Sequence, residues 1–100
     1  MEDTQERAMY KVKILPDAEK SFKKLDKSVQ LRVTKKIDWL AEYADIIIHH
    51  QLSSLPDDLK GLCKLIVGDY RVLYWVYHEL LDIKIYNIEH RSEVYRSLKR

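Results

Sequence analysis

The sequence predicts an α+β fold, in which a small, antiparallel-dominated sheet of four strands carries an N-terminal helical hairpin on one face. Three observations predict it. Apolar residues recur at helical spacing within residues 16–44, the period changes to two from residue 63 onward, and a Gly-Asp pair interrupts this later segment as a hairpin turn does. The resulting β-α-α-β-β-β order places helices and sheet around one core, as expected for a chain of 100 residues.

The chain begins with a polar segment and a short strand. Residues 1–8 show no apolar periodicity, and we interpret them as a flexible tail before a single domain over residues 9–100. Tyr10, Val12 and Ile14 alternate with lysines, which is typical of a half-exposed strand. We expect this strand to lie beside the C-terminal strand of the sheet.

Two amphipathic helices follow. Pro16 ends the first strand and suits the first turn of a helix. Asp26 is a candidate N-cap for a second helix, and the apolar spacing predicts that this helix ends near Tyr43. The apolar stripe of this second helix consists of Val29, Val33, Ile37, Leu40 and Ala44.

A connector and a three-stranded meander make up the rest of the domain. The connector over residues 45–61 is interrupted by Pro56 and Gly61. Alternating segments then predict strands over 64–67, 70–77 and 81–88, separated by turns at Gly68-Asp69 and near 78–80. The basic tail, 90–100, is expected to close as a short helix.

The Gly68-Asp69 pair also predicts a register. A two-residue type II′ loop places Val67 opposite Tyr70 and Lys64 opposite Leu73, and opposed residues share a face. The face assigned to the helices holds Leu65, Val67, Tyr70, Val72, Tyr74 and Val76. The other face holds Lys64, Ile66, Arg71, Leu73 and Trp75. This second face suits a phosphate backbone, because arginine binds phosphate and tryptophan stacks on bases, but an ordinary solvated sheet face has the same pattern.

A second group of candidate residues lies near the C-terminus. His90, Arg91, Tyr95 and Arg96 bring an imidazole, two guanidiniums and a phenol close together in the sequence. Histidine can act as acid or base near neutral pH, and cations can lower the pKa of a tyrosine. A basic helix end is the alternative interpretation, since cations complement the helix dipole there.

Composition excludes several kinds of site. The chain has 18 Lys and Arg against 16 Asp and Glu, with one Cys and two Gly. A single cysteine forms no intrachain disulfide, and we expect Cys63 to be a small core residue. The adjacent His49 and His50 do not share a face, so we expect neither metal nor cofactor. Without a long apolar run we expect no membrane contact and place the protein in the cytoplasm.

Two motifs resemble the RelE branch of the RelE/ParE toxin superfamily. One is the turn Gly68-Asp69-Tyr70-Arg71, preceded by Lys64, and the other is His90-Arg91 followed by Tyr95 and Arg96. The helix start at Pro16 and the leucine-rich connector through Gly61 match the same pattern. The resemblance extends from Met9 to Tyr95 and depends on both motifs together.

The resemblance implies the toxin of a type II toxin–antitoxin module. Such RelE-like toxins are small ribonucleases that cut messenger RNA, typically in the A site of the 70S ribosome, by attack of the RNA 2′-hydroxyl without a metal ion. The implied partner is a cognate antitoxin, bound in a heterotetramer or larger assembly. Operator DNA would be contacted only through that antitoxin.

The resemblance also implies roles for single residues. Arg71 would bind phosphate and stabilise the transition state, Arg91 would clamp phosphate, and Lys64 matches one of a pair of strand lysines. Tyr95 would stack on or activate the substrate. His90 has no fixed counterpart in the family, but its chemistry and position suit it to act as acid or base. The RNA-binding residues expected around them are Lys60, Trp75 and Arg96.

Two positions depart from the RelE pattern. Leu62 stands where the first strand lysine is usual, and Glu89 stands where a basic residue precedes the final motif. Two other functions therefore stay open. One is a ParE-like toxin that inhibits DNA gyrase by binding alone, and the other is a weakened toxin that mainly binds its antitoxin.

Overall fold

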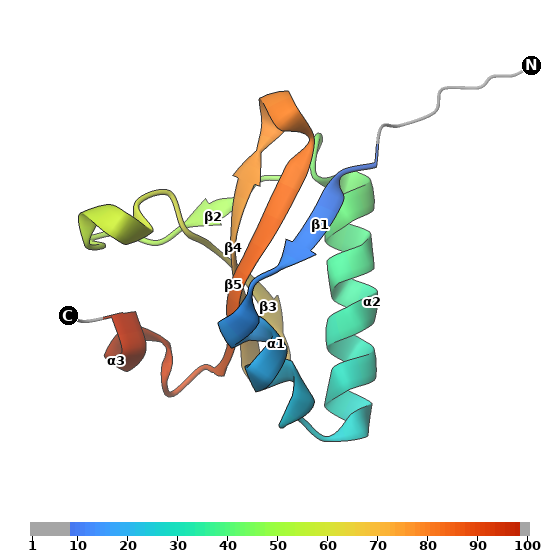
Figure 1. The fold of residues 1–100 in the computed structure, drawn as a ribbon, viewed down its shortest axis with the longest axis vertical. Helices are drawn as coiled ribbons and strands as arrows, with labels where there is room; N and C mark the ends of the chain where they lie inside the picture. The colour runs from blue at the N-terminus through green and yellow to red at the C-terminus, as the bar shows by residue number, and fades with distance from the viewer. Residues whose placement is uncertain (1–8, 99–100) are drawn as a thin grey trace, which may run out of the picture.

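In the computed structural model, which describes residues 9–98, two helices lie on one face of a sheet and a third lies on the other (Figure 1). The sheet has five strands in the order β1-β5-β4-β3-β2, with β1 parallel to β5 and the other neighbours antiparallel. Its strands are β1 (Lys11–Ile14), β2 (His50–Gln51), β3 (Cys63–Val67), β4 (Tyr70–Tyr77) and β5 (Asp82–His90). The helices are α1 (Pro16–Lys23), α2 (Lys27–Tyr43) and α3 (Val94–Leu98), with short 3-10 turns η1 (Asp57–Leu59) and η2 (His78–Leu80).

Most of the element order expected from the sequence is confirmed. Helix α1 begins at Pro16, and Asp26 precedes α2 as its N-cap residue, although the Asp26 side chain makes no capping bond. Strand β1 lies beside β5, as expected. The sheet has five strands where the sequence predicted four. The additional strand, β2, has two residues within the connector, too few for an alternating pattern, and forms by pairing His50 with Lys64. The tail predicted over 1–8 lies outside the described residues.

The main core lies between the sheet and the helical hairpin. Val33 and Leu40 of α2 are fully buried against Ile83 and Ile85 of β5 and against the face predicted for the helices. That face contributes the buried Val67, Val72 and Tyr74 and the partly buried Leu65, Tyr70 and Val76. The predicted assignment of these residues to the helix side is therefore confirmed.

A second apolar cluster covers the middle of the opposite face. Leu73 is fully buried there beneath leucines of the connector and residues of α3. The cluster consists of Leu52, Leu59, Leu62, Leu73, Val94 and Leu98. The expectation that this whole face is open to RNA or solvent is wrong, because the connector leucines and α3 need an apolar surface of their own. Arg71 and Trp75 remain partly exposed on either side of the covered region.

A bulge in β5 allows this strand to contribute side chains to both apolar clusters. Leu73 pairs with Asn87 and Tyr74 pairs with Ile85, so Tyr86 is an additional residue in the ladder. Ile85 and Ile88 are three residues apart, yet both contribute to the main core. Tyr86 packs with the second cluster, where its ring meets Trp75 edge-on at 5.4 Å.

Partly buried hydrogen bonds join His49 to β4 and to the end of α2. The Tyr74 hydroxyl and His49 Nδ1 lie 2.7 Å apart, and His49 Nε2 lies 2.8 Å from the Ala44 carbonyl oxygen. That carbonyl can only accept, so Nε2 carries the proton and the Tyr74 hydroxyl donates to Nδ1. Burial raises the pKa of Tyr74, with a smaller effect from Cys63. Within residues 9–98, no helix has both the length and the apolar character needed to span a bilayer.

We expect Leu73→Ala to destabilise the protein by about 2–5 kcal/mol, because it leaves a cavity in the second cluster. Urea unfolding monitored by circular dichroism measures this loss. Leu31→Ala is the matched control, since Leu31 is 57% exposed on α2, and it should change stability by less than about 0.5 kcal/mol. Similar losses in the two variants would contradict a structural role for the second cluster.

We expect the thiol of Cys63 to be unreactive in the folded protein at pH 8. The side chain is buried, and burial raises its pKa to about 11, so only on the order of one molecule in a thousand carries the reactive thiolate at that pH. Iodoacetamide labelling followed by mass spectrometry tests this. Labelling should become rapid in 6 M guanidinium, and equal rates with and without denaturant would show that the thiol is not protected.

Candidate functional site

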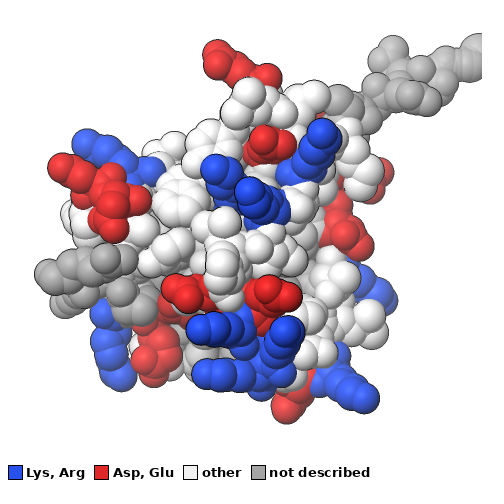
Figure 2. All heavy atoms as spheres, viewed as in Figure 1, with Lys and Arg blue, Asp and Glu red and all other residues white. Residues whose placement is uncertain are grey.

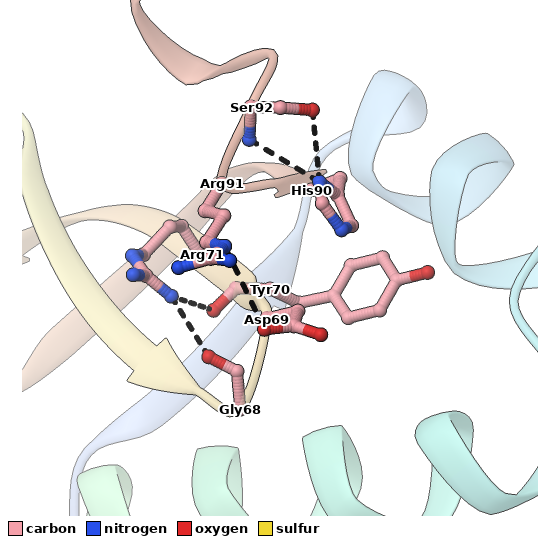
Figure 3. Close-up of polar contacts among 7 residues, drawn as sticks. All are labelled: Gly68, Asp69, Tyr70, Arg71, His90, Arg91 and Ser92. Atoms are coloured by element: carbon pink, nitrogen blue, oxygen red, sulfur yellow. Dashed lines mark hydrogen bonds and ion pairs between the residues drawn. The ribbon is translucent and has the colours of Figure 1, made fainter.

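Some of the predicted site residues lie around the β3–β4 turn and the adjoining end of β5 (Figure 3). Tyr70 pairs with His90, and Arg71 pairs with Glu89. The chain then leaves the sheet at Arg91, whose backbone N–H donates to the Asp69 carbonyl at 2.7 Å. The β3–β4 turn is thus joined directly to the segment that leads into α3.

The turn has the geometry expected from its sequence. Gly68 has a φ of +59° and Asp69 is not among the described residues with positive φ, which is the type II′ arrangement. Val67 pairs with Tyr70 and Lys64 pairs with Leu73, so the predicted register is confirmed. This register places Arg71 at the end of the sheet, on the face opposite the helical hairpin.

Arg71 is held against the backbone of this turn. Its Nη1 donates to the carbonyl oxygens of Gly68 and Tyr70, at 3.0 and 2.9 Å. Figure 3 shows both bonds running from one end of the guanidinium. A guanidinium has five N–H donors, so Arg71 is fixed in position while retaining donors on Nε and Nη2 that can bind an anion.

Arg91 faces Asp69 of the same turn. Its Nε is 3.6 Å from Asp69 Oδ1, and both side chains are about two-thirds exposed. An exposed pair of this kind contributes only about 0–1 kcal/mol, so an incoming anion can displace it. The arrangement offers two guanidiniums to a phosphate group, one fixed by backbone contacts and one held by an exchangeable ion pair.

His90 has a defined role in hydrogen bonding. Its Nδ1 lies 3.2 Å from the backbone nitrogen of Ser92 and 2.9 Å from the Ser92 hydroxyl. A backbone N–H can only donate, so Nδ1 accepts and the neutral ring carries its proton on Nε2. The ring also packs edge-on against Tyr70, at 5.3 Å between centroids, and so lies with Tyr70 on the helical-hairpin side of the sheet, the face opposite to that of Arg71. His90 therefore presents Nε2–H as a donor.

The remaining predicted residues lie at different distances from this group. Lys64 is a diagonal neighbour of Arg71, roughly 7–8 Å away along the ladder. Trp75 is four residues farther along β4 than Arg71, about 13 Å, and its Nε1–H donates to the Lys60 carbonyl at 3.0 Å. Lys60 and Trp75 thus lie together but apart from Arg71.

Of the two predicted site residues in α3, the structure describes the side chain of Arg96 but not that of Tyr95. Arg96 is exposed, and its Nη1 lies 3.3 Å from Glu93 Oε1. The backbone of Tyr95 belongs to α3, but its side chain lies outside the described part of the structure.

Sequence reasoning missed two side chains of the site. Asp69 was assigned only to the turn, although it also faces Arg91, and Ser92 was not assigned although it orients His90. The signal for Ser92 was present in the sequence, because a hydroxyl two residues after a histidine is within reach of its Nδ1. The pairing of Asp69 with Arg91 depends on the fold, which brings the turn to the end of β5.

Charge elsewhere on the molecule is mixed. Figure 2 shows cationic side chains gathered over α1 with acidic side chains next to them, in keeping with the net charge of +2. Among residues 9–98, no group of three or more His, Cys, Asp or Glu is arranged to hold a metal ion.

A family model agrees with the resemblance seen in the sequence. The model for the ParE toxin of the type II toxin–antitoxin system parDE matches residues 12–95. This chain belongs to the ParE toxin family. The resemblance placed the chain in the RelE/ParE superfamily, which is confirmed, whereas the family model is that of ParE rather than of the RelE branch. Comparison with curated proteins found no match.

Solved structures of related toxins share the fold. A RelBE toxin–antitoxin complex from Mycobacterium tuberculosis matches with a TM-score of 0.70 and 22% identity, covering 85% of this chain and 94% of that one. A RelE–RelB complex from the archaeon Pyrococcus horikoshii matches at 0.64 and 29% identity, covering 83% and 96%. A heterotetrameric YoeB–YefM complex from Staphylococcus aureus matches at 0.58 and 17% identity, covering 83% and 98%.

The two departures from the RelE pattern have structural explanations in this toxin. Leu62 is fully buried in the second cluster, so its position serves packing and supplies no cation. Glu89 lies opposite Arg71 and accepts a hydrogen bond from Asn87 Nδ2 at 2.8 Å. The site consequently carries a negative side chain next to one of its arginines.

We expect Gly68→Ala to destabilise the toxin by about 1–2 kcal/mol, because alanine is strained at positive φ. The added Cβ would also come within 3.0 Å of Arg32 Nη1, a flexible side chain that can move. Thermal and urea unfolding measure the change. Asp69→Ala is the neighbouring control and should cost about 0.5 kcal/mol or less, since it removes only an exposed ion pair. An unchanged stability of Gly68→Ala would contradict the turn geometry.

Proposed function

We propose that this toxin is an endoribonuclease that cuts messenger RNA on the ribosome without a metal ion and is neutralised by a cognate antitoxin. The observation that carries the proposal is the placement of Arg71 and Arg91 at one end of the sheet, where Arg71 is bonded to the turn and Arg91 is paired with Asp69 of the same turn. Two guanidiniums suit a phosphodiester, because each can hydrogen-bond a phosphate oxygen.

The chemistry needs an in-line attack within the RNA itself. The 2′-oxygen forms a bond to the adjacent phosphorus while the bond from phosphorus to the 5′-oxygen breaks, which leaves a 2′,3′-cyclic phosphate and a 5′-hydroxyl. Arg71 and Arg91 would hold the non-bridging oxygens and stabilise the additional charge of the transition state. Because Arg71 is fixed by two backbone carbonyls, it needs little reorganisation during the reaction.

Two proton transfers complete the reaction. The leaving 5′-oxygen must gain a proton, and we assign His90 to this step because its Nε2–H is available as a donor while Ser92 occupies Nδ1. Since the His90 ring packs on Tyr70, on the face opposite Arg71, this assignment requires the RNA to pass around the end of the sheet. The proton of the 2′-hydroxyl must be removed, and we assign this to Tyr95 or Lys64. Lys64 lies diagonally from Arg71 on the same face of the sheet.

The RNA on either side of the cut would follow the exposed parts of the same face. Trp75 is half-buried and packs against Tyr86, so its remaining surface suits stacking on a base. Lys60 is exposed next to it, and Arg96 is exposed on α3. We propose that these three residues bind the RNA without taking part in the reaction.

We further propose that the toxin domain comprises residues 9–100 and acts in the cytoplasm, where ribosomes are. Relatives from Mycobacterium tuberculosis and Pyrococcus horikoshii were crystallised with their partners, and the YoeB–YefM complex is a heterotetramer. We propose a comparable complex here, in which the antitoxin also makes any contact with operator DNA.

A gyrase-inhibiting function is the second candidate. It is favoured by the match to the ParE family model over residues 12–95. The buried Leu62 and the acidic Glu89 point in the same direction, because both reduce the positive charge around the site. In that case the arginines would contact the target protein, and no bond would be broken. A weakened toxin that mainly binds its antitoxin would have the same residues without either activity.

We expect Arg71→Ala to lower cleavage of ribosome-bound messenger RNA by about 100-fold or more, because it removes the fixed phosphate ligand. The assay is translation of a defined messenger by purified ribosomes, with the RNA ends mapped by primer extension. Lys23→Ala is the control, since Lys23 is an exposed cation on α1, and it should cut normally.

The same preparation distinguishes the other candidates. Intact RNA together with inhibited DNA supercoiling by purified gyrase would establish the second function and overturn the ribonuclease proposal. Intact RNA and uninhibited gyrase would indicate the weakened toxin. Circular dichroism of each variant confirms that a loss of activity is not a loss of fold.

A further inference from the structure

Glu89 lies where its charge could neutralise an arginine of the candidate site. It is paired with Arg71 across the β4–β5 ladder, so the two side chains share one face of the sheet. Residues directly opposite in such a ladder have Cβ atoms roughly 4.5–5.5 Å apart, and opposite charges at these positions attract each other. A carboxylate that bound the Arg71 guanidinium would occupy the donors that a phosphate needs. An anion site at Arg71 therefore depends on where the Glu89 carboxylate is held.

The Arg71 side chain does not bind Glu89 in the structure. Within the described part of the chain, its guanidinium donates from Nη1 to the carbonyl oxygens of Gly68 and Tyr70, and no ion pair joins it to Glu89. The Glu89 carboxylate is bonded along its own strand, where its Oε2 accepts from Asn87 Nδ2 at 2.8 Å. The carboxylate is thus held toward Asn87 rather than across the ladder.

The Asn87 amide is fixed in the orientation that this bond requires. Its Oδ1 lies 2.9 Å from the backbone nitrogen of Ile88 and 2.7 Å from the hydroxyl oxygen of Ser21. A backbone N–H can only donate, so the amide atom that faces it is the oxygen, and the amide nitrogen is the atom that faces Glu89. With two donors on its oxygen, the amide presents an N–H to the carboxylate.

The fold places Asn87 where α1 can reach it. Strand β1 pairs with β5 only as far as Ile85, and Asn87 is the second residue beyond that point, next to the bulge. Helix α1 begins directly after β1, and its Ser21 donates to Asn87. A chain of hydrogen bonds therefore runs from α1 through Asn87 to Glu89, and it ends opposite Arg71.

We propose that Asn87 is a positioning residue of the candidate site, which holds the Glu89 carboxylate away from Arg71 and so leaves this guanidinium able to bind an anion. Asn87 acts through Glu89 and makes no contact with the anion itself. The inference rests on the proposed function in one respect, since it takes Arg71 as a ligand of phosphate. Position 89 can therefore be acidic without loss of the anion site.

The test is a titration of the purified full-length chain with inorganic pyrophosphate, followed by NMR on the Nε–H signal of the Arg71 side chain. We expect Asn87→Ala to weaken pyrophosphate binding at Arg71 by about two- to fivefold, because the released carboxylate competes for the guanidinium as in an exposed ion pair. Before pyrophosphate is added, the Arg71 Nε–H should exchange with water more slowly in this variant than in the unmodified chain.

Two further variants separate an action through Glu89 from a loss of structure. In a chain that already carries Glu89→Gln, Asn87→Ala should leave pyrophosphate binding unchanged, because no carboxylate is left to restrain. Gln30→Ala is the matched control, since it removes another partly buried amide, one that donates to the Phe22 carbonyl oxygen. It should bind pyrophosphate as the unmodified chain does. Circular dichroism shows whether each variant remains folded.

Three outcomes would overturn the proposal. One is unchanged pyrophosphate binding at Arg71 in Asn87→Ala. Another is an equal weakening by Asn87→Ala with and without Glu89→Gln, or by Gln30→Ala, which would show that Asn87 acts through the fold alone. The third is an Arg71 signal that pyrophosphate does not shift in the unmodified chain. The titration contains no RNA, so the expected binding pattern together with an intact messenger would leave this inference in place and overturn only the ribonuclease proposal.

Discussion

The two-residue turn at Gly68 is the constraint on which the rest of the structure depends. Along β4, Val72 and Tyr74 are buried against the helical hairpin, while Leu73 between them is buried in the second cluster. A slip of one residue would exchange these faces and would turn Arg71 toward the helices. The positive φ of Gly68 keeps the turn at two residues and so sets both cores and the position of Arg71 together.

Apolar clusters on both faces of the sheet restrict where this toxin can bind anything. The helical hairpin covers one face, and the connector with α3 covers the middle of the other. The charged residues of the candidate site consequently lie at the end of the sheet, where β5 leaves the ladder at His90, and the part of β3 beyond Lys64 forms an edge that β2 does not reach. In a domain this small, the ends and edges of the sheet are the main surfaces that packing leaves available.

Sequence patterns predicted the local parts of this architecture well and the nonlocal parts less well. The helix beginning at Pro16 and the β3–β4 register follow from spacing and turn chemistry, which act over a few residues. The pairing of β2, the bulge at Tyr86 and the cover over Leu73 arise only when distant segments meet. The candidate site shows the same division, because the predicted register places Arg71, whereas the contact of Asp69 with Arg91 required the fold.

The same turn also holds both arginines of the candidate site. Nη1 of Arg71 donates to the carbonyl oxygens of Gly68 and Tyr70. The backbone N–H of Arg91 donates to the carbonyl oxygen of Asp69, and its side chain is paired with the Asp69 carboxylate. The carbonyl oxygens of Gly68 and Tyr70 hold Arg71, and Asp69 holds Arg91, so a change in this turn would displace both arginines together.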